Sequence, residues 1–339
     1  MRLSILDYAP VDEGLEAQDA LEASLRLART ADAAGLHRYW FSEHHGMPAM
    51  VSSAPEIMMA RTAAATSTIR LGSGGVLLPN HSSFKIAENF QLLEAMFPGR
   101  IDLGFGRAPG ADQRVNGALN DEKSDQLPYG HKVADLLGFL SGQHHGGTRH
   151  AGLKALPDTA RPPQTFVLGA SGSTAEIAAQ AGLGFTFAHF INPGPRGAEA
   201  AAAYRAAFRP SAFGDTPSVV VAVFAAVGET EAEAAAFADA FHLWLSHAES
   251  TRPFNRLPSL ETARTHARSS HETAVRQRNE GRLISGTAES VAAQLQDLGR
   301  AYGTDEVMVN LMMPGEAARQ KALTSLAQAL ALAPQAVPA

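Results

Sequence analysis

Eight short segments rich in apolar and β-branched residues alternate with helix-forming stretches along the chain, and this alternation restricts its fold more than any other feature. Such a rhythm is typical of βα units around a parallel sheet. Eight units are enough to close the sheet, so we predict one α/β domain over residues 1–339, a (β/α)8 TIM barrel. An open doubly wound sheet is the alternative, because the number of strands alone does not exclude it. The expected strands are Leu3–Asp7, His37–Ser42, Ile69–Leu78, Arg100–Gly106, Thr165–Gly169, Gly184–His189, Ser218–Val227 and Glu306–Asn310.

Two helix starts carry a recognisable local signal. Ser53-x-x-Glu56, with Pro55 between them, has the spacing of a capping box, in which a hydroxyl and a carboxylate satisfy unpaired N–H groups. Ser173-x-x-Glu176 repeats the spacing later in the chain. We therefore expect helices to begin at Ser53 and at Ser173.

Two segments interrupt the rhythm. Residues 107–160, after the fourth expected strand, contain a loop with Gly and Asp and one helical stretch. Residues 249–285, after the seventh, are rich in Arg, Ser, Thr and His and have few large apolar side chains. Segments of this length in a compact domain are often lids over a site. We interpret both as insertions within the barrel domain, either lids or surface insertions.

The composition excludes several classes of function. The chain has no cysteine, so it has no disulfide, no thiolate-ligated metal and no cysteine nucleophile. Its formal net charge of −6 argues against a nucleic-acid-binding protein, which would need a basic face. The first residues lack the pattern of a secretion signal, and no uncharged apolar run reaches the roughly 18 residues of a membrane span. We therefore expect a cytoplasmic protein with no nucleic-acid or membrane partner.

The second expected strand ends in Glu43-His44-His45, at the end of a barrel where functional residues gather. A histidine there can act as a general base or a hydrogen-bond donor near neutral pH. Neighbouring side chains on a strand point to opposite sides, so only one of the two histidines can face the mouth. A metal site completed by a histidine from the stretch 144–150, or a structural role, are the alternatives. We predict an active-site role for His44 and no metal.

Glycines and an arginine end the third and fourth expected strands. Gly74 and Gly75 lie inside a strand, where glycine marks either a bulge or a close approach of a ligand to the backbone. Gly104 and Gly106 leave space in the mouth, and Arg107 offers planar donors that suit a phosphate. A bulge that bends the barrel and an arginine in a surface ion pair are the alternatives.

The fifth expected strand runs into a helix through Ser171-Gly172-Ser173-Thr174. Free N–H groups and the helix dipole at such a start favour an anion. The segment is not a Walker loop, because no Gly-Lys-Ser/Thr follows it. Serine-rich helix starts are also common without a ligand, so the phosphate interpretation draws its strength from its combination with Arg107.

Together these motifs resemble the bacterial luciferase-like monooxygenase family, most closely its FMN-type, single-chain branch. The resemblance spans nearly the whole chain and is most specific from the second to the fourth strand. It rests on YWFSEHHG from residue 39, IRLGSGGVLLPNHSSFKIAENFQLLEAMFPGRIDLGFGRAPG from residue 69, GASGSTAEIAAQAGLGF from residue 169 and ISGTAESVAAQL from residue 284.

The resemblance implies that reduced FMN binds in the barrel mouth and that O2 is a co-substrate. His44 matches the active-site histidine of the family, a base or a stabiliser of the oxygenated flavin. Gly74-Gly75 matches the place of a non-prolyl cis peptide beneath the flavin ring. Arg107 and the four residues from Ser171 to Thr174 match phosphate-binding positions, and Asp7 at the end of the first strand is a weaker candidate for the cofactor site.

The resemblance also implies partners. These are a separate NAD(P)H:flavin reductase, a small organic substrate that the sequence does not identify, and a second copy of the chain in a homodimer. Gly106 and Ala170 stand where the catalytic subunit of bacterial luciferase has a reactive cysteine and a glutamate, so we expect no light emission. The alternatives on the same fold are an F420-dependent dehydrogenase and a non-catalytic flavin-binding protein.

Overall fold

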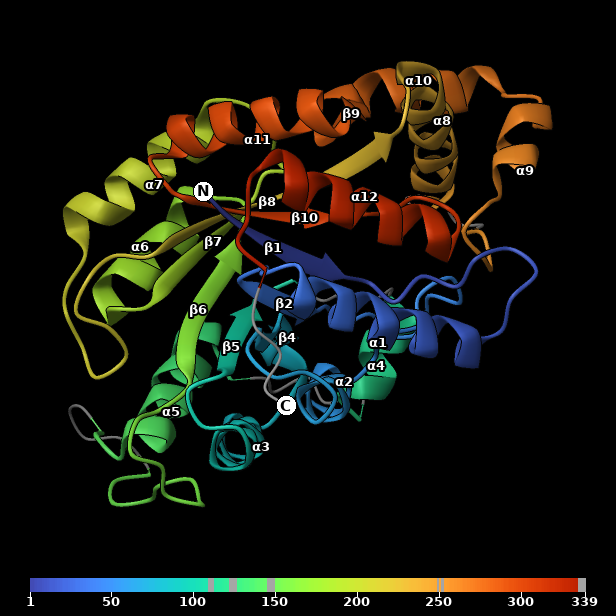
Figure 1. The fold of residues 1–339 in the computed structure, drawn as a ribbon. Coiled ribbons are helices and arrows are strands. Elements are labelled where there is room, and N and C mark those ends of the chain that lie inside the picture. The colour runs from blue at the N-terminus through green and yellow to red at the C-terminus, as the bar shows by residue number, and fades with distance from the viewer. Residues whose placement is uncertain (109–112, 122–126, 145–149, 249, 251–252, 335–339) are drawn as a thin grey trace.

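In a computed structural model the chain forms a closed barrel of parallel strands with helices around it (Figure 1), as predicted. The structure describes residues 1–108, 113–121, 127–144, 150–248, 250 and 253–334. Its strands are β1 (Arg2–Asp7), β2 (Arg38–Phe41), β3 (Arg70–Ser73), β4 (Val76–Leu77), β5 (Ile101–Gly106), β6 (Gln164–Gly169), β7 (Gly184–Ala188), β8 (Val219–Gly228), β9 (Leu283–Thr287) and β10 (Glu306–Asn310). The order β1-β2-β3-β5-β6-β7-β8-β10 closes where β10 pairs with β1.

Helices connect the strands and cover the outside of the barrel. They are α1 (Ala17–Ala33), α2 (Pro55–Ala63), α3 (Ser83–Met96), α4 (Gln113–Leu119), α5 (Tyr129–Ser141), α6 (Gly172–Ala181), α7 (Arg196–Ala207), α8 (Glu231–Ala248), α9 (Leu260–Thr265), α10 (Ser270–Asn279), α11 (Ala288–Tyr302) and α12 (Glu316–Ala329), with short 3-10 turns at Leu78–Asn80 and Glu280–Arg282. In Figure 1, α8, α9 and α10 gather on the side toward which the arrowhead of β1 points. Among the described residues no helix is long and apolar enough to span a membrane.

Two strand predictions need correction. The third expected strand is broken at Gly74-Gly75 into β3 and β4. The strand β9 was missed altogether, although it pairs in parallel with β8 from Phe224 and Leu283 to Gly228 and Thr287. The insertion boundary drawn at residue 285 is therefore wrong, because it falls inside this strand. Most side chains of β9 are only partly buried. Its sequence therefore shows no clear alternation of apolar and polar residues.

Both capping-box predictions are wrong in detail. The helix α2 begins at Pro55 without a side-chain cap, and the Glu56 carboxylate instead accepts a hydrogen bond from Asn89 at 3.2 Å. The helix α6 begins two residues earlier than expected, with Ser171 and not Ser173 at its N-cap. The spacing of a capping box is necessary for the motif, but the motif does not form when the carboxylate accepts a hydrogen bond from a residue elsewhere in the fold.

The barrel is filled by large side chains from alternating strand positions. Trp40 and Phe166 meet edge to face with their ring centroids 5.1 Å apart. Glycines on neighbouring strands provide the space: a Cβ on Gly72 would lie 2.3 Å from the Trp40 indole, and one on Gly184 would lie 2.3 Å from the Phe166 ring. The same buried cluster contains Leu6, Val220, Ala222, Phe224 and Met308.

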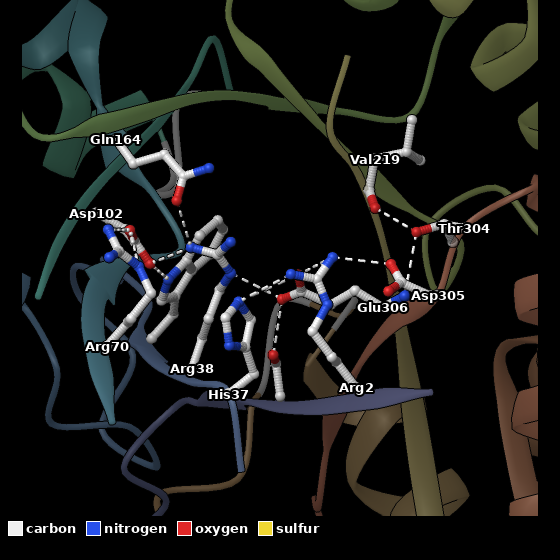
Figure 2. Close-up of polar contacts among 12 residues, drawn as sticks. Arg2, His37, Arg38, Arg70, Asp102, Gln164, Val219, Thr304, Asp305 and Glu306 are labelled. Carbon is white, nitrogen blue, oxygen red and sulfur yellow. Dashed lines mark hydrogen bonds and ion pairs between the residues drawn. The ribbon is translucent and has the colours of Figure 1, made fainter. Parts of the chain in front are cut away.

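A network of buried charges closes the end of the barrel at which the strands begin (Figure 2). Arg38, at the start of β2, donates to Asp102 on β5 at 2.7 Å and to Glu306 on β10 at 2.8 Å. Both acids are fully buried. Burial would raise the pKa of Asp102, but Arg38 and Arg70 beside it hold that pKa below its usual value. We call this network the barrel floor. The site of such a barrel lies at the opposite end, where the strands finish.

Candidate active site

His44 lies just beyond β2 and is held by three neighbours. Its Nδ1 is 2.9 Å from the Ser42 hydroxyl, and its backbone N–H donates to the Ser52 carbonyl oxygen at 2.9 Å. Its ring meets the Tyr8 ring edge to face, with centroids 4.5 Å apart. Tyr8 in turn lies against Phe224, which comes from β8 on the interior side of the barrel. The structure therefore brings His44 to the mouth of the barrel, among aromatic side chains.

The environment of His44 keeps its imidazole neutral. Burial lowers the pKa of His44 to about 4, and the neighbouring His45 acts in the same direction while Glu43 opposes it. A neutral imidazole has one nitrogen that donates and one that accepts. At physiological pH His44 is therefore an uncharged group that can donate one hydrogen bond and accept another.

Glu43 has a role that the sequence did not reveal. Its carboxylate accepts hydrogen bonds from Nε2 of His45 and of His81, each at 2.7 Å, and from the Leu77 backbone N–H at 2.9 Å. Burial would raise the pKa of Glu43, but these hydrogen bonds lower it, and the same contact with Glu43 raises the pKa of His81 against the effect of burial. The carboxylate ties the end of β2 to the end of β4 and fixes the orientation of the segment that carries His44.

Two of the histidines that could complete a metal site with Glu43, His44 and His45 pack on α5. His144 and His150 lie against Phe139, with ring centroids 5.7 and 5.2 Å away. His144 also contacts the Leu153 carbonyl oxygen. His145 lies outside the described residues.

The glycines of the third and fourth expected strands lie where predicted, on adjacent walls. The peptide bond between Gly74 and Gly75 is cis, as the family resemblance implied. A Cβ on Gly75 would lie 2.9 Å from the Gly104 carbonyl oxygen, and one on Gly104 would lie 2.2 Å from the Ser73 carbonyl oxygen. A Cβ on Gly106 would have no neighbour closer than 3.4 Å. Gly104 is thus required for packing, whereas a Cβ on Gly106 would make only ordinary van der Waals contacts.

Arg107 follows β5 at the mouth and is exposed. Gly106 pairs with Leu168 of β6, so Arg107 follows β5 next to the end of β6, from which the chain turns into α6. Within the described part of the chain, no residue forms a side-chain hydrogen bond or ion pair with its guanidinium group. The surface ion pair that was the alternative is therefore absent from the described residues.

Three hydroxyl groups gather at the start of α6. The Ser171 hydroxyl lies 3.0 Å from that of Ser173 and 3.2 Å from that of Thr174. No side chain caps this helix, and the first N–H that bonds back along it belongs to Ala175. Unpaired N–H groups and hydroxyls together form a donor-rich site of the kind that binds anions. The predicted phosphate residues are therefore neighbours at the ends of two paired strands.

Asp7 does not face the mouth. It shares the side of β1 that carries Leu3 and Ile5, which pack in the cluster beneath the helices. Its carboxylate accepts hydrogen bonds from the Tyr39 hydroxyl at 2.6 Å and from the Ala9 backbone N–H at 2.7 Å. The prediction that Asp7 contacts the cofactor is therefore corrected: the residue fixes the turn after β1.

The insertion 249–285 contacts the mouth at two places. Leu257 is fully buried in the barrel cluster and pairs with the loop after β1, where its N–H donates to the Val11 carbonyl oxygen at 2.7 Å. Arg282 donates from Nε to the Phe190 carbonyl oxygen at 2.5 Å, and the Phe190 ring lies 4.7 Å from that of Phe224. These contacts place the segment beside the mouth. Whether it acts as a lid stays a prediction.

The closed barrel and its polar mouth assign the chain to the TIM-barrel proteins, whose sites form where the strands end. The model of the luciferase-like monooxygenase family matches residues 1–305, and the chain belongs to this family. YceB of Bacillus subtilis is 41% identical over 310 residues, which cover 91% of this chain and 93% of YceB. The N-acetyl-S-alkylcysteine monooxygenase of the same organism is 44% identical over 193 residues, which cover 57% of this chain and 58% of that protein.

Solved structures share the fold. The crystal structure of apo-MsnO8 has a TM-score of 0.88 at 34% identity and covers 98% of this chain and 99% of its own. The oxygenating constituent of 3,6-diketocamphane monooxygenase from Pseudomonas putida, in complex with FMN, has a TM-score of 0.69 at 17% identity, with 98% of both chains covered. The coenzyme F420-dependent tetrahydromethanopterin reductase from Methanopyrus kandleri has a TM-score of 0.68 at 15% identity and covers 98% of this chain and 99% of its own.

Proposed function

We propose that this chain is a monooxygenase that binds reduced FMN at the barrel mouth and uses O2 to oxygenate a small organic substrate. The single observation that carries the proposal is the donor set at the ends of β5 and β6. It joins one exposed arginine to three hydroxyl groups and an uncapped helix start. This set has the chemistry that a phosphate monoester requires, and it lies at the same end of the barrel as the neutral His44.

Arg107 and the start of α6 would hold the phosphate of FMN. The hydroxyl groups of Ser171, Ser173 and Thr174 can each donate to a phosphate oxygen, and the guanidinium group can donate twice. Gly169 supports this arrangement, because a Cβ there would lie 2.4 Å from the Thr174 hydroxyl and would displace it. Reduced FMN, when bound, would supply the electrons that activate O2.

His44 would move or hold a proton beside the flavin. The Ser42 hydroxyl donates to the Asp7 carbonyl oxygen at 3.5 Å, so its lone pair is free to accept from Nδ1–H of His44. In this orientation Nε2 of His44 is the unprotonated nitrogen. The low pKa of His44, about 4, keeps Nε2 available as an acceptor at neutral pH. The aromatic side chains of Tyr8 and Phe224 would exclude water around it.

The proposal includes partners. A separate NAD(P)H:flavin reductase would supply reduced FMN. A homodimer is supported by exposed apolar side chains on the neighbouring helices α2 and α3, where Ile57, Leu92 and Met96 are 69%, 50% and 48% exposed. The relative that acts on N-acetyl-S-alkylcysteines gives the first compounds for a substrate panel.

The phosphate contact is tested by measuring the dissociation constants of FMN and reduced FMN with Arg107→Ala. We expect binding to weaken by roughly 10- to 100-fold, because a hydrogen bond to a charged group contributes about 1.5–3 kcal/mol. Arg161→Ala is the matched control, since Arg161 is also exposed but precedes β6 at the opposite end of the barrel. Ser171→Ala should weaken binding less than Arg107→Ala does.

Three outcomes would contradict the proposal. Unchanged FMN affinity in Arg107→Ala would remove the phosphate contact. Preferential binding of F420, which absorbs at a different wavelength from FMN, would favour a dehydrogenase. Tight FMN binding without O2 uptake on any substrate in the panel would favour a flavin-binding protein.

A further inference from the structure

Outside the mouth, two histidines and a glutamate from α8, the end of α9 and α10 have their ligand atoms close together. His247 lies near the end of α8, His266 follows α9, and Glu272 is in the first turn of α10. The Glu272 Oε1 atom lies 2.8 Å from Nε2 of His247 and 2.9 Å from Nε2 of His266. Within the described part of the chain, this is the one group of three such ligand atoms that all lie within 4.8 Å of one another.

The carboxylate is aimed at the histidines by its second oxygen. Glu272 Oε2 accepts from the Ser269 backbone N–H at 2.6 Å and from the Ser269 hydroxyl at 2.9 Å, which completes a capping box at the start of α10. Partial burial would raise the pKa of Glu272, but these hydrogen bonds and those from the two histidines lower it to about 2. Glu272 is therefore an oriented carboxylate at every physiological pH.

The two imidazoles are also held in place. The His247 ring packs on Phe254 with centroids 4.2 Å apart, and the backbone N–H of His266 donates to the Thr262 carbonyl oxygen at 3.0 Å. The side chains of His247, His266 and Glu272 are 26%, 28% and 12% exposed. The cluster is ordered by its neighbours and still open to an ion from solvent.

We propose that His247, His266 and Glu272 form a binding site for one divalent transition-metal ion of the zinc type. Two imidazole nitrogens and one carboxylate oxygen are a donor set that suits Zn²⁺, Co²⁺ or Ni²⁺, whereas Mg²⁺ and Ca²⁺ prefer oxygen ligands alone. Each imidazole would offer the lone pair of Nε2 and carry its proton on Nδ1. Water would complete the coordination.

The geometry needs only small movements to accept the ion. Ligand atoms about 2.0–2.1 Å from a tetrahedral metal lie roughly 3.3 Å apart. The two contacts with Oε1, at 2.8 and 2.9 Å, would open slightly as the ion replaces the hydrogen bonds. The Ser269 contacts would still fix the carboxylate, as partners of metal ligands do in other sites.

Such an ion would tie together a segment that has little apolar packing of its own. The helix α9 buries Ala263, and α10 buries Val275 and Asn279. Ion pairs also join Arg268, just before α10, and Arg276 on α10 to Asp239 on α8. A metal bridge between α8, α9 and α10 would therefore stabilise the insertion that contacts the mouth through Arg282.

The test uses the full chain without a histidine tag, after treatment with EDTA. Calorimetric titration with Zn²⁺ and the visible absorption of bound Co²⁺ should both give one ion per chain, and Zn²⁺ should raise the thermal midpoint. Affinity should fall at least 10-fold in His247→Ala, His266→Ala and Glu272→Gln. His271→Ala is the matched control, because His271 is exposed on the same helix. It should bind as the wild type does.

The proposal is overturned by the absence of binding at millimolar Zn²⁺, or by one-to-one binding that persists in the variant carrying both His247→Ala and His266→Ala. A loss of affinity in His271→Ala equal to that in His266→Ala would also overturn it. Far-UV circular dichroism of each variant separates lost ligands from lost structure. If His247→Ala unfolds, His266→Gln gives the same comparison at a position just beyond the end of α9.

Discussion

Arg38 is the cation on which two fully buried acids of the barrel floor depend, so Arg38→Met tests how that floor is held together. Methionine keeps an apolar stem of similar length against the Phe166 ring, over which the guanidinium group lies at 4.9 Å. The substitution therefore removes the charge with little change in packing. Asp102 would keep its bonds from Arg70 and from the Trp40 indole N–H, whereas Glu306 would keep only the Ser4 hydroxyl as a close partner.

The expected cost is set by the charge left behind. Breaking a buried ion pair by removing one partner typically costs about 3–5 kcal/mol, because the other charge stays buried without compensation. Glu306 already has one carboxylate oxygen, Oε2, without a hydrogen bond, and its ion pair with Arg2 is long, at 3.6 Å. We therefore place the loss near the upper end of that range. Adding Glu306→Gln should recover at least about 1 kcal/mol, since it removes the uncompensated charge.

Equilibrium unfolding in urea, followed by tryptophan fluorescence, measures the loss once refolding has been shown to be complete. Arg61→Met is the matched control, because its ion pair with Glu22 is exposed on both sides and should contribute less than about 1 kcal/mol. An Arg38→Met variant that loses no more than this control would refute the reasoning. So would a double variant that is less stable than Arg38→Met alone.

Two further predictions concern the walls and the acid limit of the barrel. Gly104→Ala should destabilise the chain by about 1–3 kcal/mol through overpacking and should weaken FMN binding, because its Cβ meets a carbonyl oxygen at 2.2 Å. Gly106→Ala should be tolerated. The urea midpoints of the two variants test this, and equal losses of stability would contradict it. Burial, with help from Arg276, lowers the pKa of His242 to about 4, so the unfolded chain binds more protons than the folded one below pH 6.5. The free energy of unfolding should therefore fall as the pH drops from about 6.5 to 4. His242→Leu should make that fall shallower, while His271→Ala should leave it unchanged. If the free energy of unfolding depends on pH in His242→Leu as it does in the wild type, His242 is not involved.

The barrel strands could be predicted because their signal is local. Segments such as Val219–Gly228 are continuously apolar and β-branched, as a strand buried on both faces must be, and each is followed by a stretch long enough to form a helix. The strand β9 has no such signal. It forms because the second half of β8, from Phe224 to Gly228, offers it a partner. That pairing depends on the tertiary fold, so no pattern within Leu283–Thr287 reveals it.

The site residues also include some whose positions could be predicted from the sequence and some whose contacts could not. The position of His44, Arg107 and the start of α6 at the barrel mouth could be predicted, because they directly follow strands and the closed barrel brings all strand ends to one mouth. The contact of Glu43 with His81 could not be predicted, since the two residues are 38 positions apart and meet only after β2 and β4 have taken their places. The error at Asp7 was avoidable. The period of two along β1 places it on the side of Leu3 and Ile5, which face the helices.

The two ends of the barrel differ in how their polar groups are used, and this difference bears on which end binds a ligand. At the floor, Arg38 is shared between Asp102 and Glu306, so its donors are consumed by the protein itself. At the mouth, the described residues leave Arg107 without an ion pair and the first N–H groups of α6 without a cap. Donors without partners inside the protein are available to an anion from outside. The sequence alone, with arginines at both ends of its strands, does not contain this distinction.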